Sequence, residues 1–123
     1  MCLIILANDI QSINYKDLEI AYNRNSNGFG VMYINKKDKF ISDKFVPNNF
    51  TEVKNFFNLH KNETDRMAIH FRYTTEGKTN RKNCHPFISY QDDKRTIGLM
   101  HNGARLPIPL VHKNCSDTWH YNE

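Results

Sequence analysis

The sequence has no hydrophobic run long enough to cross a membrane. A membrane-spanning helix needs about 20 consecutive apolar residues, whereas the apolar run at residues 2–7 is far shorter. This run also lacks the positively charged front and the length of a secretory signal peptide. We therefore expect a cytoplasmic protein that has no membrane partner.

Cysteine is scarce, and its spacing is irregular. The three cysteines are Cys2, Cys84 and Cys115, and an odd number is typical of a reducing compartment rather than of a disulfide framework. Four side chains toward the end of the chain could be considered as zinc ligands: His101, His112, Cys115 and His120. Because no Cys-x-x-Cys pair supports them, we interpret them as loop histidines and a free thiol. We expect no metal and no other cofactor.

The chain also lacks a block of like charge. Its net charge of +4 would suit an acidic partner, but its Lys and Arg residues are scattered among Asp and Glu. Nucleic acid is therefore not expected as a partner. Because the chain has 123 residues, no internal repeat and no low-complexity segment, we expect residues 1–123 to form a single domain with one core.

The hydrophobic pattern predicts short strands with helices between them. Strands are expected at residues 2–7, 29–34, 39–42, 66–73, 86–90 and 95–100, and helices at 15–22 and 50–60. Asn49 or Thr51 can cap the second helix, and Ser116 and Asp117 resemble a further helix cap near the end of the chain. Strands outnumber helices, so we predict an α+β fold.

One predicted strand, at residues 66–73, alternates sharply between apolar and polar positions. His70 and Arg72 fall on its less apolar face. A polar loop follows at residues 74–83, so Arg72 leaves the strand next to that loop.

Cys2 has a distinctive chemical position, because it directly follows the initiating methionine. If Met1 is removed, the thiol and a free α-amino group belong to the same residue. An α-amine with a pKa of about 8 can accept the thiol proton, directly or through one water molecule, and the thiolate is then the nucleophile. We expect Met1 to be removed, since a cysteine at the second position is small enough to allow it.

Six sequence elements occur together in this chain. They are Cys2, Asn27-Gly28-Phe29-Gly30, His70-Phe71-Arg72-Tyr73-Thr74-Thr75-Glu76-Gly77, Asn83-Cys84-His85-Pro86-Phe87, His101-Asn102-Gly103 and Ser116-Asp117-Thr118. In this order they resemble the class II glutamine amidotransferases, whose N-terminal-nucleophile (Ntn) glutaminase domain releases ammonia from glutamine. The resemblance implies an Ntn-hydrolase-like four-layer αββα sandwich with antiparallel sheets.

The resemblance also implies a reaction and a role for individual residues. Cys2 would attack the side-chain amide of L-glutamine to give a γ-glutamyl thioester and ammonia, and water would then release glutamate. The other matching residues are Asn102 and Gly103 for the oxyanion hole, and Arg72, Thr75 and Asp117 for substrate binding. Arg72 would hold the α-carboxylate of glutamine and Asp117 its α-ammonium, since a zwitterion needs one anchor of each sign.

Each of these residues also has a purely structural interpretation. Asn102-Gly103 is typical of a hairpin turn, Arg72 of a surface ion pair and Asp117 of a helix N-cap. Four further residues match family positions that support the active-site loops: Asn27, Gly28, His70 and His85. The combination of all six elements favours the glutaminase interpretation over the separate structural ones.

The family glutaminase domain is usually longer than this chain and continues beyond the residue matched by Asp117. We therefore expect a C-terminally short domain, either a trimmed fold whose exposed sheet is covered by a partner or a second copy, or a fragment of a longer protein. A separate synthetase or transferase would use the ammonia. The alternative is a catalytically inactive relative that keeps the glutaminase fold for binding or regulation.

Overall fold

The structure, a computed structural model, describes residues 2–123 and contains two antiparallel sheets and three α-helices. The strands are β1 (Leu3–Ala7), β2 (Gly28–Ile34), β3 (Phe40–Phe45), β4 (Met67–Arg72), β5 (Phe87–Gln91) and β6 (Thr96–Leu99). The helices are α1 (Tyr15–Arg24), α2 (Phe50–Lys61) and α3 (Asp117–Asn122), with 3₁₀ turns η1 (Ile10–Ser12) and η2 (Arg81–Asn83). The predicted α+β class is confirmed, whereas the four-layer arrangement stays a prediction.

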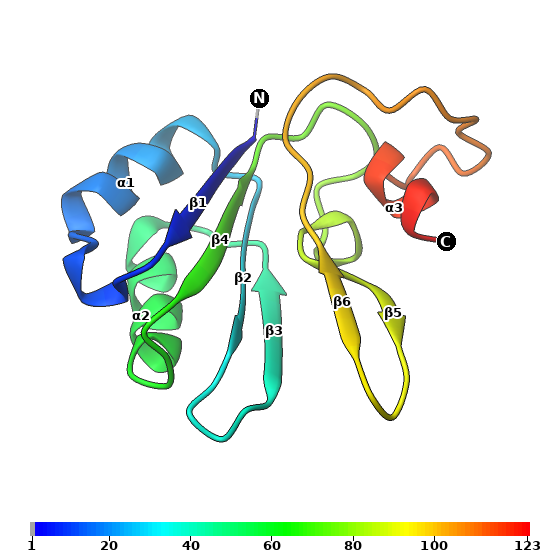
Figure 1. Ribbon diagram of the computed structural model, residues 1–123. Coiled ribbons are helices and arrows are strands. Elements are labelled where there is room, and N and C mark those ends of the chain that lie inside the picture. Colours follow the sequence, from blue (N-terminus) through cyan, green and yellow to red (C-terminus); the bar gives the residue numbers. More distant parts are fainter. Residues whose placement is uncertain (1) are drawn as a thin grey trace.

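The larger sheet has four strands in the order β1-β4-β2-β3, and every neighbouring pair is antiparallel. The central strand β4 pairs Phe71 with Leu3 of β1 on one side and with Phe29 of β2 on the other. Strands β5 and β6 form a separate two-stranded hairpin. Helices α1 and α2 lie on one side of the larger sheet and the hairpin on the other (Figure 1).

Both long helices begin at an asparagine cap, as their sequences suggest. The side chain of Asn14 accepts a hydrogen bond from the backbone of Asp17, and that of Asn49 accepts one from Glu52. Asn49, rather than Thr51, is therefore the cap of α2.

Among residues 2–123, no helix combines the length and apolar character that crossing a bilayer requires.

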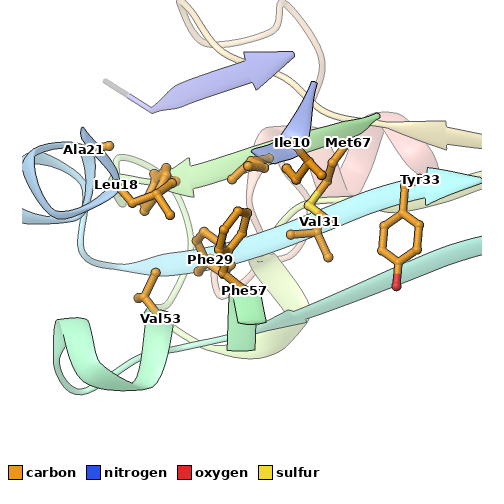
Figure 2. Close-up of a cluster of buried hydrophobic side chains, with 11 residues drawn as sticks. Ile10, Leu18, Ala21, Phe29, Val31, Tyr33, Val53, Phe57 and Met67 are labelled. Carbon is orange, nitrogen blue, oxygen red and sulfur yellow. The ribbon is translucent and has the colours of Figure 1, made fainter. Parts of the chain in front are cut away.

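The hydrophobic core lies between the larger sheet and helices α1 and α2. Phe29, Ile69 and Phe71 belong to this core, and each is fully buried. Leu18 of α1 and Phe57 of α2 pack against them. Figure 2 shows Phe29 next to Phe57 of α2. The rings of Phe29 and Phe71 meet edge to face with their centroids 4.9 Å apart, so the register of β2 with β4 is fixed by its largest side chains.

The opposite face of the sheet is covered by the segment that leads into β5. A Cβ atom added to Gly30 would lie 1.7 Å from the backbone oxygen of His85, so only glycine allows this crossing. On β6, a Cβ atom added to Gly98 would lie 2.6 Å from the sulfur of Met32. Because of this cover, His70 is fully buried on the less apolar face of β4. Both faces of β4 are therefore buried at this end, which the sequence alternation did not predict.

Replacing Phe29 by alanine tests the position of the core. We expect Phe29→Ala to lower the free energy of unfolding by about 3–5 kcal/mol, because it removes a fully buried ring. The matched control is Leu59→Ala on α2, where the side chain is 73% exposed and the change should stay within about 0.5 kcal/mol. Urea unfolding followed by circular dichroism measures both, and equal losses would contradict the described core.

Candidate active site

A small cavity brings together residues that are far apart in the sequence. It lies among Cys2, the end of β4, the loop after β6 and the start of α3, toward the end of the molecule where the chain begins (Figure 1). Six of the predicted site residues line it: Cys2, Arg72, Thr75, His85, Gly103 and Asp117. Its volume is about 30 Å³, which is room for about two water molecules.

Cys2 reaches the cavity because β1 pairs with β4. Leu3 lies opposite Phe71, so Cys2 continues this pairing toward Tyr73. The backbone N–H of Tyr73 donates to the Cys2 sulfur at 3.4 Å, and the carbonyl oxygen of Tyr73 lies 3.6 Å from the same sulfur. The N–H group stabilises a thiolate, whereas the carbonyl accepts the proton of a thiol. The half-buried sulfur is thus held in place in either state.

Arg72 is only 3% exposed and is held by the loop that follows β4. Its Nη1 donates to the carbonyl oxygen of Lys78 and its Nη2 to that of Glu76, each at 2.9 Å. Burial lowers the pKa of Arg72, and the nearby thiols of Cys84 and Cys2 oppose this change. The interpretation of Arg72 as a surface ion pair is therefore wrong. In this conformation its guanidinium holds the loop after β4 through two backbone carbonyls.

Asn27 and Gly28 pack against the arginine and its loop. The N–H of Asn27 donates to the Arg72 carbonyl at 2.8 Å, and its side-chain oxygen accepts from the N–H of Thr74 at 2.9 Å. A Cβ atom added to Gly28 would lie 2.6 Å from the sulfur of Cys84 and 3.0 Å from Cβ of Arg72. The close approach of Cys84 and Arg72 therefore leaves no space for a side chain at position 28.

Asp117 is the first residue of α3 and is 8% exposed. Its Oδ2 accepts from the backbone N–H of Leu106 at 2.8 Å, and its Oδ1 accepts from that of Thr118 at 2.8 Å. The N-cap is Ser116, whose hydroxyl accepts from the N–H of Trp119. The N-cap interpretation of Asp117 is therefore wrong, and its carboxylate instead ties the long loop before α3 to the cavity.

Two buried histidines hold the start of the loop after β6. The rings of His70 and His85 stack with centroids 3.9 Å apart and an interplanar angle of 3°. His70 Nε2 donates to the carbonyl oxygen of His101 at 3.0 Å, and the N–H of His101 donates to His85 Nδ1 at 3.0 Å. Both backbone groups of His101 are thus fixed by one imidazole pair, and Asn102 and Gly103 follow directly.

The hydrogen bond from His101 requires the His85 ring to be neutral, and burial keeps the His70 ring neutral as well. His85 accepts at Nδ1, so its proton lies on Nε2, whereas His70 donates at Nε2 and leaves a buried Nδ1 without a partner. Burial lowers the pKa of His70 to about 4 and that of His85 to about 2. Protonation would place two positive charges in a stacked, desolvated pair, which the fold opposes.

The predicted oxyanion pair is only partly at the cavity. Gly103 lines it, whereas Asn102 is exposed and does not. Gly103 has φ of +139°, a conformation that other residues rarely adopt, although a Cβ atom there would find open space. The two residues lie in the long loop between β6 and α3, so the hairpin-turn interpretation is wrong.

The other candidate features lie away from this cavity. A hollow of about 640 Å³ opens elsewhere, between Leu6, Met32 and Ala68 of the larger sheet, and has neither cysteine nor histidine in its lining. The side chains considered as zinc ligands do not form a metal site. Within residues 2–123, no group of three or more His, Cys, Asp or Glu side chains is positioned to hold a metal ion.

Several cavity residues had no assigned role in the sequence. Thr118 is fully buried, and its hydroxyl lies 3.3 Å from Nδ1 of His101. Glu76 also lines the cavity, and its carbonyl binds Arg72. Both residues belong to the six sequence elements that carry the resemblance, which was the available signal, but the resemblance gives a role to neither.

Comparison with known proteins gives this chain no relative. No protein-family model, no curated protein and no solved structure matches it. The resemblance to class II glutamine amidotransferases therefore depends on the sequence elements alone.

The buried histidine pair predicts a loss of stability in acid. The folded pKa of His70 is about 4, below the value of about 6.5 for an unfolded chain, so the unfolded state binds more protons below pH 6.5. The contribution of His70 is complete above pH 6.5, falls as the pH drops to 4, and amounts to about 3 kcal/mol. Urea unfolding at several pH values measures it.

The control separates this pair from other titrating groups. His70→Gln should make the dependence of the unfolding free energy on pH between 6.5 and 4 less steep, with the remainder coming from His85; His112→Gln, on the exposed loop, is the control. Parallel curves for the natural chain and His70→Gln would show that His70 is not buried as a neutral ring.

Proposed function

We propose that this chain has the glutaminase activity of a class II glutamine amidotransferase, with Cys2 as its nucleophile. The observation that carries the proposal is the meeting of a half-buried thiol, a buried guanidinium, a carboxylate and a glycine of positive φ at one cavity. These groups come from four separate parts of the chain. Amide hydrolysis needs a nucleophile, a stabiliser of negative charge and a grip on the substrate.

In the first half of the proposed reaction, the Cys2 thiolate attacks the side-chain amide carbon of glutamine. The thiol proton passes to the α-amino group of Cys2, which becomes free when Met1 is removed. The tetrahedral intermediate collapses with release of ammonia, which receives that proton, and leaves a γ-glutamyl thioester. Water then attacks the thioester, releases glutamate and restores the thiol. The predicted removal of Met1 lies outside the described residues.

The oxyanion of the intermediate is stabilised by the loop after β6. Gly103 lines the cavity, and in this proposal its backbone N–H and the side-chain NH₂ of Asn102 donate to the oxyanion after the loop closes on a substrate. The His70 and His85 pair holds the first residue of this loop at both its backbone N–H and its carbonyl. The donors are therefore attached to a fixed point, which favours stabilisation of developing charge.

Substrate binding in this proposal uses Arg72, Thr75 and Asp117. Arg72 gives the buried side of the cavity a positive charge, and Asp117 brings a carboxylate to the same cavity. Glutamine is much larger than the two or so water molecules that a cavity of about 30 Å³ holds. The loops that carry Thr75 and Gly103 must therefore move apart to admit it.

The proposal includes the Ntn-type sandwich as the finer description of the fold. Helices α1 and α2 would be the first layer, the four-stranded sheet the second, and the β5-β6 hairpin the start of the third. The packing of Gly98 against Met32 on the face opposite the core supports this order.

A second candidate function is a catalytically inactive binding or regulatory protein with the same fold. Two features favour it: the Arg72 guanidinium is already bound to two backbone carbonyls, and Asn102 does not reach the cavity. A binding protein has no need of a reactive thiol at Cys2, so chemical reactivity separates the two functions.

Replacing Cys2 tests the nucleophile directly. We expect Cys2→Ala to reduce glutaminase activity by about 10³-fold or more, because no other group in the reaction can form the thioester. Cys115→Ala, which removes another buried thiol, should keep the activity within a few fold. Ammonia release from L-glutamine measures both.

Covalent labelling distinguishes an enzyme from a binding protein. The glutamine analogue 6-diazo-5-oxo-norleucine should add once to the chain, at Cys2, and intact-mass spectrometry should also show that Met1 is absent. A chain that has lost Met1 but takes no label would favour the binding protein.

Replacing Gly103 tests the oxyanion position. Gly103→Ala should lower kcat by about 10²–10³-fold with a small change in KM, because φ of +139° is strained for alanine and the N–H would turn away. The space around the new Cβ is open, its nearest neighbour being His101 Nε2 at 3.9 Å, so the fold should survive. Ala104→Gly is the control on the same loop, and an unchanged kcat for Gly103→Ala would exclude this donor.

A further inference from the structure

A polar cavity lies between the edge strand β3 and the segment that leads into β5. Its volume is about 230 Å³, and Lys44 of β3, Arg81 of η2 and Phe87 of β5 are part of its lining. This lining shares no residue with that of the candidate active site, whose cavity is several times smaller. The proposed glutaminase reaction therefore gives this cavity no role.

Lys44 reaches the cavity beside the crossing of the chain over Gly30. It pairs with Gly30 of β2, so its side chain lies on the face of the sheet opposite to the core. Its Nζ donates to the carbonyl oxygen of Cys84 at 2.7 Å and lies 4.2 Å from the centroid of the Phe87 ring. These two contacts hold the amino group at the wall of the cavity.

The ammonium group of Lys44 is partly buried without a counterion. In the part of the chain that the structure describes, no Asp or Glu side chain forms an ion pair with it. Burial lowers the pKa of Lys44 to about 8, with smaller contributions from the charges of Arg81 and Arg72, and the thiol of Cys84 opposes the change. A cation in these surroundings favours an anionic ligand.

Arg81 adds a second positive charge to the same lining. Its Nε donates to the backbone carbonyl oxygen of Lys44 at 3.0 Å, which fixes the guanidinium beside β3. Its Nη2 lies 3.8 Å from Oδ1 of Asp43, which is too far for a hydrogen bond, and the side chain is 66% exposed. Its terminal N–H groups are therefore available to a ligand, and a guanidinium can donate two of them to one phosphate.

Asp43 is the one carboxylate among the described residues of this lining. It pairs with Val31 of the core, so its side chain leaves β3 on the side opposite to Lys44. There its Oδ2 lies 3.3 Å from Nε2 of His60. Since two cations share the lining with this carboxylate, the cavity keeps a net positive charge.

The rest of the lining suits an organic group. Pro86, Phe87 and Ile88 supply apolar surface, and Ser42 adds a hydroxyl group. A bare phosphate ion has the size of only a few water molecules and would leave most of this cavity unfilled. A ligand with an anionic group and a small apolar body would match both parts of the lining.

We propose that this cavity binds a small phosphate monoester, with Lys44 and Arg81 holding the phosphate group and Phe87 next to the organic part. The proposal concerns binding, and no bond of the ligand is broken. It does not depend on the glutaminase function, because the two cavities have no residue in common.

Replacing either cation should weaken the binding of phenyl phosphate. At pH 7 we expect Lys44→Gln and Arg81→Gln each to raise its dissociation constant about tenfold or more, because each removes a charge-assisted hydrogen bond. Lys16→Gln, on the exposed face of α1, removes a positive charge elsewhere and should change nothing. Isothermal titration calorimetry measures each constant, and circular dichroism checks that each variant is folded.

The dependence of binding on pH separates Lys44 from an ordinary surface lysine. Phenyl phosphate is a dianion above pH 7, whereas Lys44, with a pKa of about 8, loses its charge as the pH rises. We therefore expect binding to weaken about tenfold between pH 7 and pH 9. Lys44→Arg should still bind and should lose this dependence, because a guanidinium stays charged.

The other groups that face Lys44 do not titrate in this range. Burial raises the pKa of the Cys84 thiol and lowers the pKa of His85 to about 2, so both stay neutral. Carboxylates and guanidinium groups stay ionised between pH 7 and pH 9, which applies to Asp43, Arg72 and Arg81.

Comparison with inorganic phosphate tests the organic part of the ligand. Phenyl phosphate should bind more tightly, since its ring reaches the apolar lining, and equal affinities would contradict the monoester. Unchanged binding in Lys44→Gln and Arg81→Gln, equal weakening in Lys16→Gln, or the same pH dependence in Lys44→Arg as in the natural chain would each overturn the assignment. A natural chain that binds neither ligand would also exclude the site.

Discussion

The crossing of the chain over Gly30 is the contact on which the rest of the site depends. The backbone of His85 passes so close to β2 that no side chain could be present at position 30. This approach lets the His85 ring stack on His70 of β4 and places Cys84 against Arg72 and Gly28. One glycine thus converts the less apolar face of the sheet into a second buried layer, from which the candidate site is built.

Much of the fold could be predicted from the sequence, because its elements are set by local patterns. The six strands and two long helices lie close to their predicted ranges, and the asparagine cap of α2 is correct. What the pattern could not predict is the burial of His70 and Arg72. The environment of His70 is created by residues 84–86, and that of Arg72 by Cys84 and the loop after β4. Alternation within one strand therefore contains no information about either.

The candidate site also has one part that the sequence predicted and another part that it did not. The family resemblance predicted that Cys2, Arg72, Gly103 and Asp117 belong together, and all four line one cavity. The sequence did not predict that Arg72 would be covered by its own loop, that Asn102 would stay outside, or that Glu76 would enter. These features depend on how the flanking loops pack, because backbone carbonyls rather than side chains satisfy Arg72. The sequence elements therefore predicted which residues share a cavity better than they predicted the conformation of the loops around it.

The stacked histidines show why the interior here is polar rather than hydrophobic. Two apolar side chains of similar volume would fill the same space, but they would leave the N–H and carbonyl of His101 without partners, at a cost of about 1–3 kcal/mol for each buried group. The neutral imidazoles satisfy both groups and still bury their rings. The hydrogen bonds of both rings therefore stabilise the same segment, the start of the loop that carries Asn102 and Gly103. A buried polar pair of this kind links the stability of the fold to the geometry of the candidate site, so a change that charges either ring acts on both.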